Sequence, residues 1–288
     1  MTALTVTPLT SAVGAELTGI DLAADLDEAS IASVRAALLD HLVLFFRDQH
    51  LSPEQHIHFA ERFGPISIPT FTTDASDRPE IIVLDQLAPK GEGADSWHAD
   101  NTYMPEPPMA SILRAVTLPD VGGDTCFASM YAAYDALSPA LRGFLDGLTA
   151  VHDIAVMVER TKHLEAAGLR EAAARWPAVV HPVVRVHPET GRKLLNVNAN
   201  WTVRIAELSG EESAALLAFL FAHLKSPDFQ CRFHWSEGAV AFWDNRVVQH
   251  YAVPDYVERR VMARVTVAGD RPFGPMDGAR TAEVAVAH

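Results

Sequence analysis

The sequence is short of three features, each of which would point to a particular class of protein. Cysteine occurs only twice, as Cys126 and Cys231, and the two lie too far apart for a metal-binding spacing. Basic residues number 23 against 37 acidic ones, and the net charge of −14 argues against nucleic acid or an anionic membrane surface as a partner. No apolar run approaches the roughly 20 residues of a membrane span. We interpret both cysteines as buried free thiols in a reducing compartment.

The first residues do not show a basic segment followed by an apolar run, so a signal peptide is not indicated. This predicts a cytoplasmic protein. A length of 288 residues with 49% hydrophobic residues is enough for one large domain with a substantial core. We see no repeat, low-complexity tract or linker, and we therefore interpret residues 1–288 as one domain with a frayed tail over residues 277–288.

Hydrophobic periodicity predicts many short strands with helices grouped around them. Helical patterns cover residues 27–41, 52–64 and 209–225, and the last two open with a capping box. Extended patterns cover residues 42–47, 80–85, 109–118, 125–129, 179–186, 193–200, 229–235, 239–243 and 260–268. The segments 179–186 and 193–200 flank a Pro-Glu-Thr-Gly turn, which predicts a hairpin. The fold class is therefore mainly β with flanking helices, as a sandwich or barrel.

Two segments are candidates for covers over a site. Residues 155–176 are rich in Ala, Arg and Glu with little apolar periodicity, and we interpret them as an insertion that acts as a lid. A solvated surface helix is an interpretation of equal weight. The loop of residues 86–96, with Pro89, Gly91 and Gly93, is the second candidate.

This loop leads into Ser96-Trp97-His98-Ala99-Asp100, the stretch that carries the clearest chemistry. In an extended strand the side chains of His98 and Asp100 point to the same side. With one further ligand they would form the 2-His-1-carboxylate facial triad of non-haem Fe(II) oxygenases. Chance supplies about one such pair in a chain of this composition, so the motif alone decides nothing.

His250 is the best third ligand, because it lies in a polar stretch between two apolar strands. Downstream, alternation in the strand of residues 260–267 places Arg260 and Arg264 on one face and four small or branched apolar residues on the other. Two arginines on an exposed sheet face would be the ordinary interpretation. A cationic pair this close in sequence to a metal ligand instead suits a dicarboxylate that chelates the metal.

At this point the chain resembles the taurine dioxygenase (TauD/TfdA) family of Fe(II)/2-oxoglutarate-dependent dioxygenases. The similarity extends over roughly residues 5 to 275. The matching motifs occur in the family's order and are WHAD (97–100), GGDT (122–125), ASMYAAYDALS (128–138), HPVVRVHPETG (181–191), WDNRVVQHYAVPDY (243–256) and RRVMAR (259–264).

The resemblance implies a double-stranded β-helix (jelly-roll) core and a closed homo-oligomer, a dimer or tetramer. It implies that His98, Asp100 and His250 bind Fe(II), with 2-oxoglutarate and O2 as cosubstrates. It further implies that Thr125 and Arg260 hold the distal carboxylate of 2-oxoglutarate. The implied reaction converts 2-oxoglutarate to succinate and CO2 while a substrate C–H is hydroxylated.

The substrate positions depart from the family pattern. Arg264 matches the arginine that meets the substrate anion, and Asn101 and Thr70 are further predicted substrate contacts. The loop of residues 64–71 has no histidine where the taurine enzyme has one, Ala94 replaces an asparagine, and Asn101 replaces a valine. These departures discount taurine itself and favour another small anion, such as a sulfonate, a sulfate ester or an aryloxy carboxylate, hydroxylated near its anionic group.

Two other functional classes stay open at this point. A metal-dependent hydrolase or isomerase could use the same ligands with Zn²⁺, although paired arginines beside His250 speak against it. A non-catalytic jelly roll that binds anions without metal is the other, and the three intact ligand positions speak against that one.

Overall fold

The computed structural model describes residues 4–68, 78–87, 96–160, 171 and 173–277 of the chain. Seven strands form the largest sheet. In spatial order they are β1 (Thr5–Pro8), β2 (Ala15–Thr18), β3 (Val43–Phe46), β13 (Val240–Asp244), β5 (Ala110–Thr117), β15 (Arg259–Val267) and β4 (Ile81–Leu87). All neighbouring strands are antiparallel except β2 and β3, which pair in parallel.

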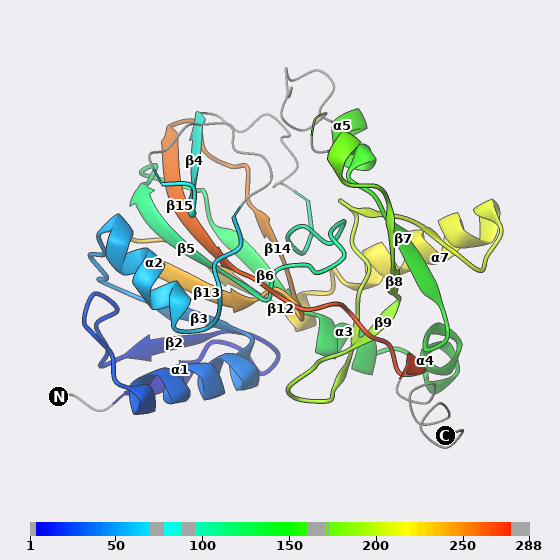
Figure 1. Ribbon diagram of the computed structural model, residues 1–288, viewed down its shortest axis with the longest axis horizontal. Coiled ribbons are helices and arrows are strands. Elements are labelled where there is room, and N and C mark those ends of the chain that lie inside the picture. Colours follow the sequence, from blue (N-terminus) through cyan, green and yellow to red (C-terminus); the bar gives the residue numbers. More distant parts are fainter. Residues whose placement is uncertain (1–3, 69–77, 88–95, 161–170, 172, 278–288) are drawn as a thin grey trace.

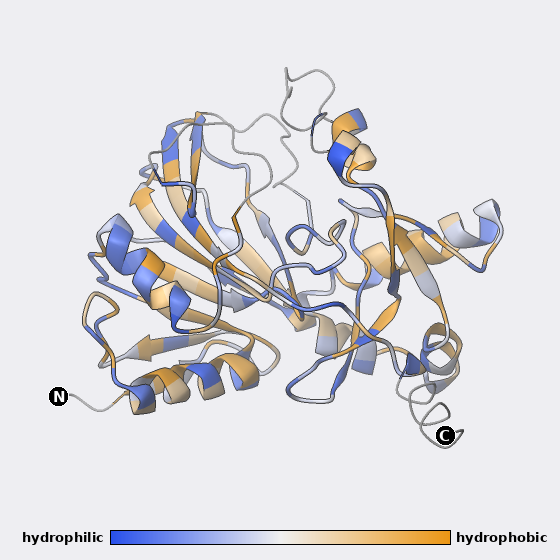
Figure 2. Ribbon diagram, in the orientation of Figure 1, coloured by the Kyte–Doolittle hydropathy of each residue, from blue (hydrophilic) through white to orange (hydrophobic). Residues whose placement is uncertain are grey.

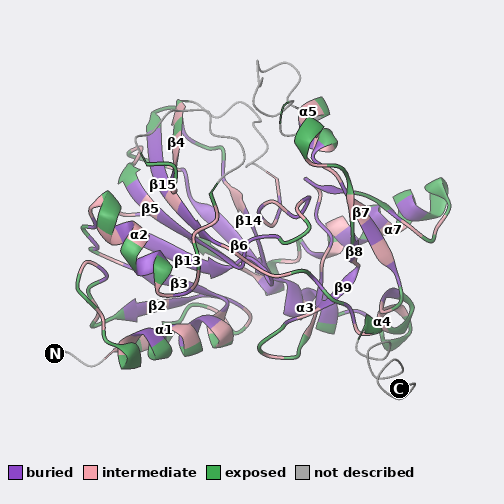
Figure 3. Cartoon of the chain, in the orientation of Figure 1, coloured by how far each residue is buried: buried purple, intermediate pink, exposed green. Residues whose placement is uncertain are grey.

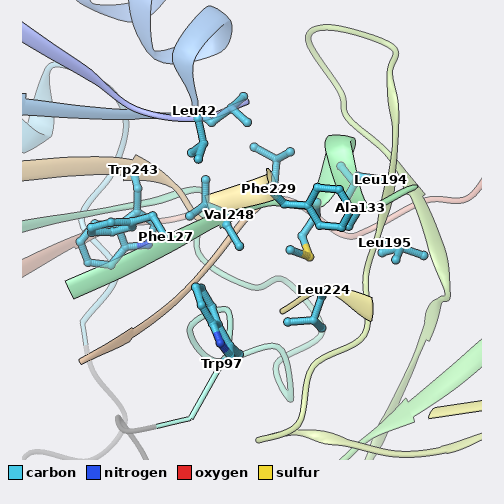
Figure 4. Packing of buried hydrophobic residues seen from close by; sticks show 14 of the residues in the cluster. Leu42, Trp97, Phe127, Ala133, Leu194, Leu195, Leu224, Phe229, Trp243 and Val248 are labelled. Atoms are coloured by element: carbon cyan, nitrogen blue, oxygen red, sulfur yellow. The ribbon is translucent and has the colours of Figure 1, made fainter. Parts of the chain in front are cut away.

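A second sheet packs against one face of the first. It consists of β12 (Gln230–Phe233), β6 (Thr125–Ser129) and β14 (Val248–Ala252), all antiparallel. The interior between the sheets holds one large apolar cluster that includes Phe45, Phe127 and Trp243. Figure 4 shows Phe127 beside Trp243, with ring centroids 5.6 Å apart. Two mostly antiparallel sheets that face each other across a shared core confirm the predicted mainly β architecture with a jelly-roll core.

Two helices bury the other face of the large sheet. α1 (Glu28–His41) and α2 (Pro53–Glu61) contribute Val34, Leu38 and Phe59 to a second apolar cluster with residues of β3, β5, β13 and β15. Figure 2 shows apolar and polar residues following one another around α1, and Figure 3 shows the exposed residues on its outer side. The central strands are therefore covered on both faces, which explains why Val240–Asp244 is a continuous buried run.

Local sequence signals determine where the helices begin. The Ser52 and Ser209 side chains accept hydrogen bonds from the backbone N–H groups of Gln55 and Glu212, which reciprocate in two complete capping boxes. The α2 helix ends at Glu61, whereas the sequence predicts an end at Gly64.

The remaining elements form the opposite side of the molecule, where Figure 1 shows β7, β8, α5 and α7 away from α1 and α2. They are α3 (Met130–Asp135), α4 (Pro139–Leu145), β7 (Thr149–His152), α5 (Ala155–Arg160), β8 (Val179–Pro182), β9 (Val184–Val186), β10 (Lys193–Leu195), β11 (Thr202–Ile205), α7 (Gly210–His223) and the short 3-10 helix η1 (Pro227–Phe229). Strands β8, β7 and β11 form one small sheet, and β9 and β10 another.

The predicted hairpin of residues 179–186 and 193–200 is correct only in part. β9 and β10 pair around the turn as expected, but β8 turns away and pairs with β7. Residues 196–200 form no strand, because Asn198 uses its side chain to bind the backbone N–H groups of Asn200 and Trp201 in a tight turn.

Several predicted segments fall partly outside the described residues. The predicted lid is described at α5 and at residues 171 and 173–176, most of the loop 86–96 lies outside the description, and so does the tail from residue 278. Among the described residues, no helix is long and apolar enough to cross a membrane.

Candidate metal centre

A single antiparallel bridge brings the two histidines together. His98 donates its backbone N–H to the carbonyl of His250 at 3.1 Å, and His250 returns the bond at 2.8 Å. His250 lies at the centre of β14, where register with Phe127 of β6 places it over the core. Residues 152 positions apart in the sequence thus share one bridge, and their ring centroids lie 4.4 Å apart.

Three side-chain atoms converge at this bridge. The Oδ1 atom of Asp100 lies 3.7 Å from Nε2 of His98 and 3.9 Å from Nε2 of His250. Cis ligands with metal bonds of about 2.1 Å lie roughly 3.0 Å apart, so a bound metal ion would draw these donors together by about 1 Å or less. Across the described part of the chain, this is the one group of three His, Cys, Asp or Glu donors close enough to hold a metal ion. The predicted ligands are therefore brought together, and their role as iron ligands stays a prediction.

The hydrogen bonding of the His98 ring and the burial of the His250 ring both suit metal binding. The Nδ1–H of His98 donates to the backbone carbonyl of Ser96 at 2.7 Å, which leaves Nε2 with its lone pair facing Asp100. Burial, with a smaller contribution from His98, lowers the pKa of His250 to about 3. His250 is therefore neutral at pH 7 and can offer a ring nitrogen to a cation.

The carboxylate of Asp100 is ionised although it is buried. Burial alone would raise its pKa, but the Arg264 guanidinium and the hydrogen bond from Ser111 hold the pKa well below its usual range. Arg264 donates to Oδ1 at 2.9 Å and Ser111 donates to Oδ2 at 2.8 Å. An anionic oxygen beside two imidazole rings is a donor set that fits a divalent cation such as Fe(II).

A buried arginine lies on the same strand as Arg264. Arg260 is only 3% exposed, and its Nε and Nη2 atoms have no hydrogen-bond partner among the residues that the structure describes. Burial lowers the pKa of this guanidinium, although it stays protonated. A buried cation with unused donors is costly unless an anion pairs with it. The position of Arg260 therefore fits a bound carboxylate, and the alternative of a surface arginine is wrong.

The turn before β6 approaches this guanidinium closely. Gly123 has a φ of +74°, and a Cβ atom there would lie 3.1 Å from Cδ and 3.2 Å from Nε of Arg260. Only glycine therefore suits this position. The next turn residues lead into Thr125, whose hydroxyl accepts a hydrogen bond from the indole of Trp235 at 3.0 Å.

The predicted substrate contacts have different outcomes. Arg264 reaches the metal centre through Asp100. Asn101 follows Asp100 directly, and its backbone has a φ of +53°, in the left-handed region. This gives Asn101 a conformational reason to be there, since asparagine tolerates that region and β-branched residues do not. Thr70 lies outside the described residues, so its role stays a prediction.

Sequence reasoning missed the side chains that support the ligands. Ser111 binds the Asp100 carboxylate, Asn245 binds its main chain, and the Trp201 indole donates to the carbonyl of Ala99 at 3.0 Å. Trp201 lies far from the His98–Asp100 segment in sequence, and Ser111 comes 11 residues after Asp100 on strand β5. Asn245 carried a signal, as a polar residue between two apolar strands, but nothing in the pattern related it to Asp100.

Two buried histidines form hydrogen bonds with the turn that follows Asp100. His152 of β7 hydrogen-bonds the hydroxyl of Thr102 at 2.9 Å, and Nε2 of His181 donates to the carbonyl of Met104 at 3.0 Å. Burial lowers the pKa of His152 to about 3 and that of His181 to about 4. The small sheet thus binds the turn with neutral rings.

Comparisons with known proteins agree with this geometry. A family model described as "Taurine catabolism dioxygenase TauD, TfdA family" matches residues 5–266. The chain is 39% identical to an alpha-ketoglutarate-dependent sulfate ester dioxygenase of Pseudomonas putida, over 96% of this chain and 92% of that protein. It is 37% identical to an (S)-phenoxypropionate/alpha-ketoglutarate-dioxygenase of Sphingobium herbicidovorans, over 93% of this chain and 96% of that protein. A crystal structure of a taurine dioxygenase from Burkholderia xenovorans is 38% identical, with a TM-score of 0.81 over 94% of this chain and 91% of that one.

The backbone of Asn101 generates a first prediction. Replacing Asn101 with valine should lower the free energy of unfolding by about 1–2 kcal/mol, because a β-branched residue is strained at positive φ. Replacing it with glycine should leave stability close to that of the wild type. Urea unfolding of the three proteins measures the difference. A valine variant as stable as the wild type would contradict the conformational role.

The buried histidines generate a second prediction, on pH. His56 of α2 is fully buried, and burial lowers its pKa to about 4. The unfolded chain binds protons at an ordinary pKa of about 6.5, so His56, His152 and His181 stabilise the fold less as the pH drops from 6.5 towards 4. The free energy of unfolding should fall by up to about 1.4 kcal/mol per pH unit for each of these histidines.

Urea unfolding at pH 7.5, 6.5, 5.5 and 4.5 tests this prediction. His56→Gln should reduce the slope by about the share of one histidine. The matched control is His58→Gln on the same helix, because the side chain of His58 is 58% exposed. Equal effects of the two substitutions on the slope would contradict the prediction.

Proposed function

We propose that this chain, which belongs to the taurine catabolism dioxygenase TauD, TfdA family, oxidises a small organic anion and that a sulfate ester is the first candidate. Membership of the family makes it an Fe(II)/2-oxoglutarate-dependent dioxygenase with O2 as the second cosubstrate. The observation that carries the proposal is the pair of arginines on β15, one with unused buried donors and one at the metal centre. With an uncharged substrate, 2-oxoglutarate would pair with one arginine and the other arginine would have no anion to bind.

The two arginines are suited to two different anions. They are four residues apart on one face of β15, roughly 13 Å along an extended strand. Arg260 lies near Tyr256 and Trp235 at the end of the strand where Thr125 is, and Arg264 lies beside Asp100. We assign the distal carboxylate of 2-oxoglutarate to Arg260 and Thr125, and the anionic group of the substrate to Arg264.

The chain holds and orients the reactants. His98, Asp100 and His250 would hold Fe(II), which supplies the redox chemistry that couples O2 and 2-oxoglutarate to oxidation of a C–H bond. Arg260 would orient the keto acid from its far end. Arg264 would place the carbon next to the anionic group at the metal centre. The buried residues around the metal centre would exclude water from the reacting groups.

A sulfate ester gives this positioning a simple chemical outcome. Hydroxylation of the carbon that bears the ester oxygen yields an unstable intermediate that breaks its C–O bond to sulfate. The products are an aldehyde, sulfate, succinate and CO2. A sulfonate would release sulfite in the same way, and an aryloxy carboxylate would release a phenol.

The rest of the substrate would contact an apolar region. Tyr103, Ile154, Met157 and Trp201 form a separate buried apolar cluster, and Trp201 binds the segment between the two ligands His98 and Asp100. Tyr103 belongs to the turn after Asp100. This location favours substrates with an alkyl or aryl portion over taurine, whose other end is an ammonium group.

A third prediction tests the reaction and the substrate together. Anaerobic protein with Fe(II) and 2-oxoglutarate should show the weak visible charge-transfer band of a chelated keto acid. In air, alkyl sulfate esters should raise succinate formation above the uncoupled background more than alkyl sulfonates or aryloxy carboxylates of equal chain size. Bound iron without the band would contradict the reaction, and equal rates with all three substrate classes would contradict the preference for sulfate esters.

A fourth prediction separates the two arginines. Arg260→Ala should raise the KM for 2-oxoglutarate roughly 100-fold or more, because it removes one partner of a buried charge pair. Arg264→Ala should act mainly on kcat/KM for the substrate. Arg260→Lys is the matched control, since it retains the charge but loses the planar fork, and should recover part of the loss. Equal effects of both alanine variants on both reactants would contradict the assigned roles.

A further inference from the structure

We propose that Asn245 is a positioning residue that sets the place of Asp100 at the metal centre by binding its main chain. The inference rests on the proposed metal site. It extends that site to a side chain in the turn between β13 and β14, which is 3% exposed and was not among the predicted site residues.

The amide of Asn245 is fully engaged with neighbouring backbone. Its Oδ1 accepts from the backbone N–H of Asp100 at 2.7 Å, and its Nδ2 donates to the carbonyl of Asp100 at 3.0 Å. The second hydrogen of Nδ2 is directed to the carbonyl of Pro108 at 3.1 Å. The side chain thus pairs with both main-chain groups of Asp100, as a neighbouring strand would.

Asp100 needs such a partner because its strand pairing stops two residues earlier. His98 is bridged to His250, but within the described chain Asp100 makes no backbone–backbone hydrogen bond. Without Asn245, a buried N–H and a buried carbonyl would be left unpaired next to the ligand carboxylate. Asn101, with its left-handed backbone, then turns the chain away.

The turn that presents Asn245 is itself held by buried charges. The Arg246 guanidinium binds Asp244 through Nε to Oδ1 at 2.9 Å and through Nη2 to Oδ2 at 2.6 Å. His187 also contacts Oδ2 of Asp244, at 3.0 Å. In addition, the backbone N–H of Asn245 donates to the carbonyl of Met109 at 2.8 Å. The amide is therefore presented from a rigid base.

These contacts divide the placement of Asp100 between two residues. Ser111 and Arg264 determine the direction of the carboxylate, and Asn245 determines where the α-carbon lies. A facial triad needs all three donors on one side of the metal, so a displacement of the main chain by half an ångström or more would weaken binding. Asn245 would act on the metal through Asp100 alone.

The test is a thermodynamic cycle read out by metal affinity. Co(II) replaces Fe(II) because it is stable in air, and its affinity is measured by competition titration without cosubstrate or substrate. Asn245→Ala should lower the Co(II) affinity 10–100-fold, the usual effect of removing a residue that orients a ligand. In the Asp100→Ala background the same substitution should change the affinity less than about 2-fold, because no carboxylate remains to be positioned.

The matched control is Asn196→Ala, which also removes an amide that donates to a backbone carbonyl, that of Pro182 at 3.1 Å, away from the ligands. It should leave the Co(II) affinity unchanged. Asn245→Ser provides a second, smaller perturbation if Asn245→Ala does not fold.

An equal loss of affinity in both backgrounds would overturn the inference, as would wild-type affinity in Asn245→Ala. Failure of both Asn245 variants to fold would also overturn it, because Asn245 would then be a general structural residue. A folded wild-type protein that binds no Co(II) would instead contradict the proposed metal site itself.

Discussion

The antiparallel bridge between His98 and His250 is the contact on which the site depends. Its two backbone hydrogen bonds fix the distance between two segments that lie 152 positions apart in the sequence. A backbone pair is well suited to this, because its geometry does not vary with side-chain rotamers. The short segment His98 to Asp100 is further bound at Ala99 by Trp201 and at Asp100 by Asn245. Three contacts, with His250, Trp201 and Asn245, therefore hold His98 and Asp100 in position.

The balance of charge around this bridge is unusual for a buried region. Asp100 is an anion between two histidines and one arginine, and Arg260 has two buried donors without a partner among the described residues. Bare buried charges destabilise a fold unless they are paired. A divalent cation and a dicarboxylate would supply the missing charges, which agrees with an Fe(II)/2-oxoglutarate-dependent enzyme. The buried charges around this bridge are therefore costly to the fold unless partners of opposite charge bind there.

Buried charge elsewhere has a structural use. Asp244 and Arg246 are nearly fully buried and satisfied by each other, by His187 and by Glu189. The Nε and Nη2 atoms of Arg246 donate to Asp244 and Glu189, whereas the same two atoms of Arg260 have no partner among the described residues. The comparison separates two kinds of buried arginine. One completes a hydrogen-bonded network that holds a turn, and the other is open to a ligand.

Local patterns in the sequence determined the elements and the identity of the principal residues. Capping boxes at Ser52 and Ser209 and the alternation in residues 229–235 are local, because they depend on neighbours within a few residues. The predicted metal ligands His98, Asp100 and His250 and the arginines of β15 followed from residue chemistry together with the family motifs. The tertiary structure alone decided how they are supported. Ser111, Trp201 and Asn245 reach the segment from His98 to Asp100 through tertiary packing, which no periodicity encodes. The tertiary structure also decided the pairing of β8. This strand pairs with β7 and not within the predicted hairpin, because strand pairing depends on which strand edge is available in space.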